Sequence, residues 1–131
     1  MYTTEIPSWL SAATAGLASG DIEAWLDVFA DDGVHEFPFA EEGGLERLEG
    51  KDAMRAYMSE LPKFVRFGSF HDVRVREVGD DTVVEADGHH WDAVTGAPYA
   101  MRYVSVITRR EGKVTLLRDY MGRRRPRSEE N

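Results

Sequence analysis

The chain has 131 residues, no cysteine and a formal net charge of −8 at pH 7. The length predicts one domain with a real core, and the lack of cysteine excludes a disulfide framework, a thiolate zinc site and a thiol nucleophile. The acidic balance argues against a nucleic-acid partner over the body of the protein. Because neither a basic leader nor a membrane-length apolar run occurs, we expect a cytoplasmic protein with no membrane partner.

The first part of the chain predicts two short helices that pack as a hairpin. Pro7 fits the first position of a helix that should end at Gly20. Asp21 is a good cap for a second helix, whose apolar stripe extends to Phe29. The turn residues 31–33 are expected to close this helix.

A short strand, a loop and a third helix are expected next. Residues 34–39 (VHEFPF) favour a strand that is stopped by Pro38. Residues 41–50 are acidic and contain glycine, which is typical of a loop. Residues 51–61 then place apolar side chains at helical spacing, and Pro62 ends the helix.

The second half of the chain changes character and alternates as strands do. The expected strands are residues 64–78, 82–93, 99–110 and 113–121, joined by short links of the hairpin type. Residues 122–131 are charged and apolar-free, so we expect a disordered tail after a single domain of residues 1–121. Helices followed by an antiparallel meander indicate an α+β fold, in which a strongly curved sheet and three helices enclose a cavity.

The last strand, KVTLLRDYM, carries the strongest catalytic candidate. Alternation puts Asp119 on the same face as Leu117 and Met121. A carboxylate on an otherwise apolar face has its charged form disfavoured, which is how proteins make proton-transfer groups that work near neutral pH. The alternative is a structural aspartate that reaches water or pairs with Arg102 or Arg118.

The order of these elements resembles the SnoaL-like, polyketide-cyclase-like branch of the nuclear-transport-factor-2-like superfamily, whose fold is a cone-shaped α+β barrel. The resemblance extends from Pro7 to Met121, and its most particular segments are GDIEAWLDVFADDGVHEFPFA, EGKDAMRAYM and the closing RDYM. Polyketide cyclases, ketosteroid isomerases and limonene epoxide hydrolases of that superfamily move protons with pocket carboxylates. The last-strand aspartate of the cyclases and epoxide hydrolases corresponds to Asp119. The resemblance therefore implies cofactor-independent isomerase or cyclase chemistry on a small hydrophobic carbonyl compound.

One departure argues against epoxide hydrolysis by the known mechanism. If the Thr-Gly pair before the third long strand is a hairpin turn, His90 pairs with Met101 and Gly88 pairs with Tyr103. The arginine and aspartate that complete the catalytic trio of the epoxide hydrolases would then fall on Ala86 and Gly88. Neither of these residues can hold or move a proton.

His90 and Glu36 are the candidate assistants of the carboxylate. His90 is expected on the same face of the sheet as the pocket residues. A neutral imidazole there could shuttle a proton or orient a carbonyl group; the alternative is a structural histidine held by hydrogen bonds. Alternation along the first strand points the Glu36 side chain toward the pocket, at a place where the related hydrolases carry a polar group that positions water. The alternative is that Glu36 is an exposed charge on an edge strand. His35 should then point away. Because the histidine spacings are not those of a metal site, we expect no metal and no other cofactor.

The cavity is expected to suit a flat, apolar ligand. Its candidate lining residues are Trp25, Tyr57, Met101, Tyr103 and Leu117. The alternative for the aromatic residues is plain core packing.

The outer face of the sheet mixes apolar and charged side chains and therefore predicts a homodimer. This face should carry Val104, Val106, Val114, Leu116 and Tyr120 together with Glu85, Arg102 and Arg118. Two other classes of function remain open: a non-catalytic small-ligand-binding or accessory dimer, and a peptide-binding interaction module like the transport-factor branch.

Overall fold

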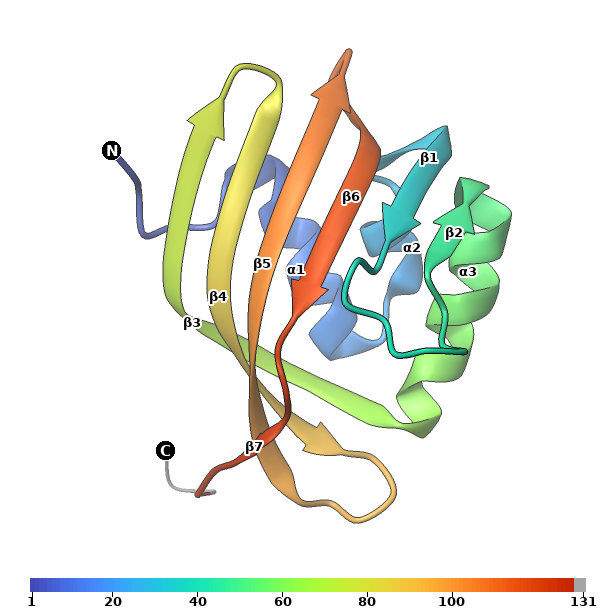
Figure 1. The fold of residues 1–131 in the computed structure, drawn as a ribbon, viewed down its shortest axis with the longest axis vertical. Coiled ribbons are helices and arrows are strands. Elements are labelled where there is room, and N and C mark those ends of the chain that lie inside the picture. The colour runs from blue at the N-terminus through green and yellow to red at the C-terminus, as the bar shows by residue number, and fades with distance from the viewer. Residues whose placement is uncertain (129–131) are drawn as a thin grey trace.

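A computed structural model describes residues 1–128 as one curved sheet with helices against its inner face (Figure 1). The helices are α1 (Ser8–Ser19), α2 (Ile22–Leu26) and α3 (Gly50–Glu60), and the short 3-10 helix η1 (Leu61–Lys63) follows α3. The strands are β1 (Phe29–Glu36), β2 (Arg47–Glu49), β3 (Val65–Val78), β4 (Asp81–Asp92), β5 (Pro98–Arg110), β6 (Lys113–Met121) and β7 (Arg125–Pro126). In the described part of the chain, no helix is long and apolar enough to cross a membrane.

The main path of the sheet follows the order β2-β1-β6-β5-β4-β3. Strands β1 and β6 run parallel, and the other neighbours on this path are antiparallel. The core lies between the inner face and the helices and includes the fully buried Leu26, Phe29 and Met54. The α+β class with a large curved sheet is therefore confirmed. The path is open, however, with edges at β2 and β3, so the sheet does not close into the expected barrel.

The first strand begins earlier than the sequence pattern predicts. Helix α2 ends at Leu26 and β1 already starts at Phe29, so the expected turn at residues 31–33 lies inside an irregular strand. The pairing of β1 with β6 shifts register between Phe29 and Val34. At this irregularity β1 approaches β6 closely, and only glycine fits at position 33, because a Cβ added to Gly33 would lie 2.9 Å from a backbone oxygen of β6. This irregularity decides which β1 side chains face inward.

Strand β3 is strongly bent (Figure 1) and pairs with β4 along its length, from Val65 opposite Asp92 to Val78 opposite Asp81. Its register with β4 shifts twice, between Arg66 and Ser69 and between His71 and Arg74. Such bulges bend a strand and increase its twist. The bend brings Phe67 close to the sheet interior, with its ring centroid 5.2 Å from that of His90.

The hairpin between β4 and β5 has a longer connection than the expected two-residue turn. The Asp92 side chain accepts two backbone N–H groups of the loop at 2.8 and 3.0 Å. Gly88 consequently lies opposite Met101, and His90 opposite Tyr99, each two residues from its predicted partner. Because the shift is by two, the residues stay on the predicted face of the sheet.

A bulge also changes one face assignment in the last strand. Strict alternation predicts Val114 on the outer face with Leu116. The register of β5 with β6 shifts between Thr108 and Arg109, and Val114 is fully buried in the core. After this point β6 alternates as predicted.

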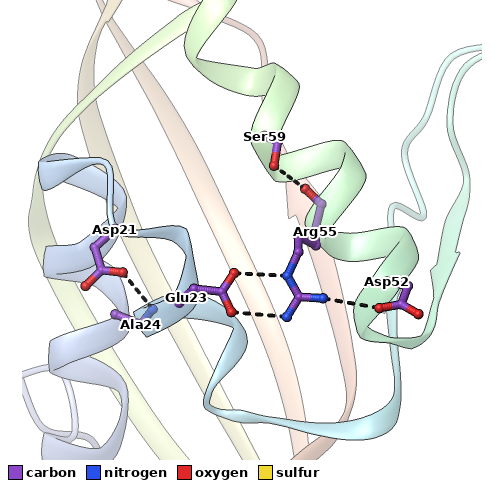
Figure 2. A network of polar contacts seen from close by, with 6 residues as sticks. All are labelled: Asp21, Glu23, Ala24, Asp52, Arg55 and Ser59. Carbon is purple, nitrogen blue, oxygen red and sulfur yellow. Dashed lines mark hydrogen bonds and ion pairs between the residues drawn. The ribbon is translucent and has the colours of Figure 1, made fainter.

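An ion-pair network fixes α2 against α3, as Figure 2 shows. The Arg55 guanidinium donates to both carboxylate oxygens of Glu23, at 3.0 and 3.1 Å, and to Asp52 at 3.2 Å. The hydrogen bonds from Arg55 hold the pKa of the Glu23 carboxyl below its usual range. Asp21 caps α2 by accepting from the backbone N–H of Ala24 at 3.2 Å. The network matters for the site because α2 and α3 both carry cavity residues.

The C-terminal segment, residues 122–128, lies against β5. Strand β7 pairs with β5, and the Gly122 amide donates to the carbonyl oxygen of Arg102 at 2.9 Å. The Arg127 guanidinium donates to the carbonyl oxygens of Tyr99 and His90 at 3.0 and 2.9 Å. The sequence pattern misses this segment because its contacts use backbone oxygens and strand pairing rather than apolar side chains. Residues 129–131 lie outside the described residues.

Candidate functional site

A cavity of about 330 Å³ lies between the inner face of the sheet and the helices. This size is within the range of small-molecule sites, which are mostly apolar with a few polar groups. Its lining includes all of Trp25, Tyr57, Met101, Tyr103, Leu117 and Asp119, the residues expected there. Of the predicted site residues, Glu36 and His90 do not line it. That the lining residues bind a substrate stays a prediction.

Asp119 projects into this cavity from β6. It lies directly opposite Ser105 of β5, whose hydroxyl donates to Asp119 Oδ1 at 3.2 Å. The Nε2 atom of His35, on the neighbouring strand β1, lies 3.4 Å from Asp119 Oδ2. Within residues 1–128 no ion pair joins Asp119 to Arg102 or Arg118, which rules out the structural alternative of such a pair. The carboxylate side chain retains 15% exposure, so it can be reached from the cavity.

His35 occupies the position that the sequence pattern gave to Glu36. The His35 residue is 4% exposed, lines the cavity, and packs its ring against Phe37 with centroids 4.3 Å apart. Glu36 instead turns to the surface, where it accepts from Arg47 at 3.0 Å. The prediction that Glu36 faces the pocket and His35 faces away is therefore wrong. The available signal was Phe37, which shares the parity of His35 and is a residue that a core strand buries.

His90 lies behind the cavity wall and supports Tyr103. Its Nδ1 accepts the backbone N–H of Gly68 at 3.0 Å, and its Nε2 lies 3.0 Å from the Tyr103 hydroxyl. These partners assign the proton to Nε2, which donates to the Tyr103 oxygen. Burial, followed by the nearby Arg127, lowers the pKa of His90 to about 4. A neutral imidazole with both nitrogens engaged has no free position from which to shuttle a proton.

The Tyr103 hydroxyl is left with one proton to donate. Burial, followed by the charge of Asp119, raises the pKa of Tyr103 well above its ordinary value. The phenol therefore stays protonated at neutral pH, and since its oxygen already accepts from His90, its O–H is available to a ligand oxygen. Tyr57 on α3 is a second phenol at the cavity, and burial, followed by the charge of Asp119, raises its pKa also.

Gly88 makes room for the His90–Tyr103 pair. A Cβ added at Gly88 would lie 2.4 Å from His90 Nε2 and 2.6 Å from a ring carbon of Tyr103. Any larger side chain would separate the two residues. Gly88 stands where the resemblance to the epoxide hydrolases implies a catalytic aspartate. Here the glycine leaves space for the contact between His90 and Tyr103.

The site therefore combines one carboxylate with hydroxyl donors in an apolar cavity. The Asp119 carboxylate and the protonated Tyr103 hydroxyl both line this cavity from the sheet. Such a pair suits a ligand that has an acidic C–H next to a carbonyl group, because the donor stabilises the oxygen charge that forms as the proton leaves.

The comparisons with known proteins agree with the fold. The same fold occurs in a solved structure of a nuclear-transport-factor-2-like protein. The sequence model of the SnoaL-like domain matches residues 10–117, and the chain belongs to this family.

Three individual proteins illustrate the relationship. The protein YesE of Bacillus subtilis (strain 168) is 38% identical over 104 residues, which cover 76% of this chain and 69% of YesE. A crystal structure from Bacillus subtilis, provisionally called an isomerase, superposes with a TM-score of 0.81 at 32% identity and covers 87% of this chain and 84% of that one. A Pseudomonas putida structure, provisionally called a polyketide cyclase, has a TM-score of 0.72 at 22% identity and covers 92% and 91% of the two chains. The last similarity concerns the fold alone.

Proposed function

We propose that the protein catalyses cofactor-independent acid–base chemistry of the isomerase or cyclase type on a small hydrophobic carbonyl compound. The observation that carries the proposal is the Asp119 carboxylate inside an apolar cavity, held by His35 and Ser105. The Bacillus subtilis relative that is provisionally called an isomerase supports the same class of reaction.

The proposed reaction begins with proton removal. Asp119 takes a proton from the carbon next to the carbonyl group, and the electron pair of the C–H bond moves to form an enolate. Tyr103 donates its O–H to the enolate oxygen, where the negative charge develops. In an isomerisation Asp119 then returns the proton to another carbon of the conjugated system. In a cyclisation the enolate carbon instead attacks a second carbonyl carbon of the same molecule, and that oxygen receives the proton.

His35 and His90 have different parts in this proposal. His35 contacts the Asp119 oxygen that does not bind Ser105, so it orients the carboxylate toward the cavity. His90 holds the Tyr103 hydroxyl from behind the wall, with its own orientation fixed by the Gly68 amide. We regard both as positioning residues, because the His35 ring contacts Asp119 and the His90 ring contacts Tyr103.

The experiment uses 3-cyclohexenone, a ketone whose double bond moves into conjugation when a proton is transferred from one carbon to another. Ultraviolet absorbance follows the conversion to 2-cyclohexenone. The Asp119→Asn variant should lose at least ~100-fold in turnover, the usual contribution of a general base. Glu36→Gln removes a carboxylate outside the cavity and should leave turnover unchanged.

Two outcomes would overturn the proposal. If the Asp119→Asn variant turns over the ketone at the wild-type rate, Asp119 is not the base. Binding of the ketone by the wild-type protein, seen as a change in tryptophan fluorescence, without any conversion above the buffer rate would instead indicate a non-catalytic binding protein.

A further inference from the structure

The cavity has a second charged side chain that the proposed chemistry does not use. Among the lining residues of the described chain, only Asp119 and Arg124 carry a full charge. Arg124 lies just before β7 and its side chain is 40% exposed, so it marks a place where the cavity meets solvent. The two opposite charges thus occupy different positions in one apolar space.

Arg124 is held in place by two contacts. Its guanidinium carbon lies 4.2 Å from the ring centroid of Tyr99, and Nη1 donates to Asp92 Oδ2 at 2.9 Å. The other oxygen of Asp92 already accepts two backbone N–H groups of the β4–β5 loop. A guanidinium carries five N–H donors in a planar fork, and the contact with Asp92 engages one of its nitrogens. Arg124 is therefore positioned and still has donors to offer.

The C-terminal segment that carries Arg124 is rich in arginine. Arg123, Arg125 and Arg127 lie on the same C-terminal segment, residues 122–128, while the whole chain has a net charge of −8. Strand β7 and the backbone contacts of Arg127 hold this segment against β5. Arg124 and Arg125 are each paired with an aspartate, so this segment positions Arg124 rather than forming a cluster of one sign.

We propose that the natural ligand bears an anionic group, in its simplest form a carboxylate, that binds Arg124 while its apolar, carbonyl-bearing part fills the cavity. The negative charge of Asp119 disfavours the reversed orientation, so the two charges align the ligand. A bidentate contact with the guanidinium fork is the expected mode of binding. This inference deepens the proposed function by naming the substrate class, and it makes Arg124 a specificity-determining residue.

The test compares two aromatic probes of matched shape, 2-naphthoate and the neutral 2-acetylnaphthalene. Dissociation constants are measured by calorimetry for the wild type and for Arg124→Gln. We expect the variant to bind 2-naphthoate at least ~10-fold more weakly, because the charge-assisted contact with the guanidinium is lost. Binding of 2-acetylnaphthalene should not change. The neutral probe reports at the same time that the cavity is intact.

Two matched variants complete the experiment. Arg123→Gln makes the same change of net charge at an exposed neighbouring residue and should leave both probes unaffected. Arg124→Lys keeps the charge and should retain part of the preference for 2-naphthoate. An equal loss for both probes in Arg124→Gln, or the same loss in Arg123→Gln, would overturn the proposal.

The result is separable from the proposed catalysis. Both probes are measured at equilibrium without turnover, so a failure here leaves the assignment of Asp119 untouched. A failure of Asp119→Asn to affect turnover would, conversely, leave the recognition of an anion by Arg124 in place.

Discussion

The pair formed by His90 and Tyr103 shows how a histidine that is buried neutral differs from a catalytic one. The ring of His90 is fully buried and both of its nitrogens have partners, the Gly68 amide and the Tyr103 hydroxyl. Protonation at Nδ1 would break the bond from Gly68 and place a charge in an apolar environment. Both effects favour the neutral ring.

This state of His90 can be measured directly. Ring nitrogen NMR shifts should report the Nε2–H tautomer and a titration midpoint of about 4, because burial lowers the pKa of His90 from 6.5. Since the folded protein then binds fewer protons than the unfolded chain between these values, stability is complete above pH 6.5. It falls as the pH drops from 6.5 toward 4, by at most about 1.4 kcal/mol per pH unit.

Chemical unfolding at several pH values provides the check. His90→Gln should lose this part of the pH dependence, while its stability at pH 7 reports the cost of the substitution itself. A midpoint near 6.5, or an Nδ1–H tautomer, would contradict the positioning role.

Individual site residues could be predicted where periodicity is regular. Asp119 follows from strict alternation in β6, and Tyr103 and Met101 follow from the same rule in β5. Alternation assigns His35 to the outward face of the expected strand, residues 34–39, although Phe37 shares its parity and is buried. Arg124 lies in a charged segment without apolar residues, which gives no signal that any of its side chains reaches a cavity. The pairing of β7 with β5 holds this segment near the cavity.

At the scale of elements, bulges account for most of the differences between pattern and structure. The order of helices and strands follows from caps, prolines and changes of period, which are local signals. The register shifts in β1, in β3 and between β5 and β6 depend on contacts between distant segments. The open edges of the sheet likewise depend on how far β3 bends, which no local pattern specifies.

The outer face of β5 and β6 supports a prediction about assembly. We propose that two copies pair through this face. Val104 is 37% exposed and lies opposite Tyr120, whose ring meets the 70% exposed Phe39 at 5.2 Å.

Light scattering tests the pairing. The wild type should have twice the 14.8 kDa mass of one chain, and Val104→Arg should shift the protein toward the monomer. Val94→Arg places the same side chain on the exposed β4–β5 loop and should remain dimeric. A monomeric wild type, or a Val104→Arg protein that stays dimeric, would refute this interface.

At the scale of the whole molecule, each layer contributes to one cavity. The sheet provides Asp119 and Tyr103, and α2 and α3 provide Trp25 and Tyr57 while the Arg55 network fixes these helices together (Figure 2). The bent β3 and the C-terminal segment complete the wall. The arrangement places the Asp119 carboxylate and the Tyr103 hydroxyl in one apolar cavity, which is the basis of the proposed chemistry.

Hydrogen–deuterium exchange on a ketone tests this chemistry most directly, because it isolates proton removal from every later step. In deuterated water, proton NMR follows the loss of the signals from the carbons next to the carbonyl group of 2-tetralone. The wild-type protein should accelerate this exchange above the buffer rate, and Asp119→Asn should reduce the enzyme-dependent part by at least ~100-fold. Equal exchange by the two proteins, or none above buffer in the wild type, would contradict the role of Asp119 as the base.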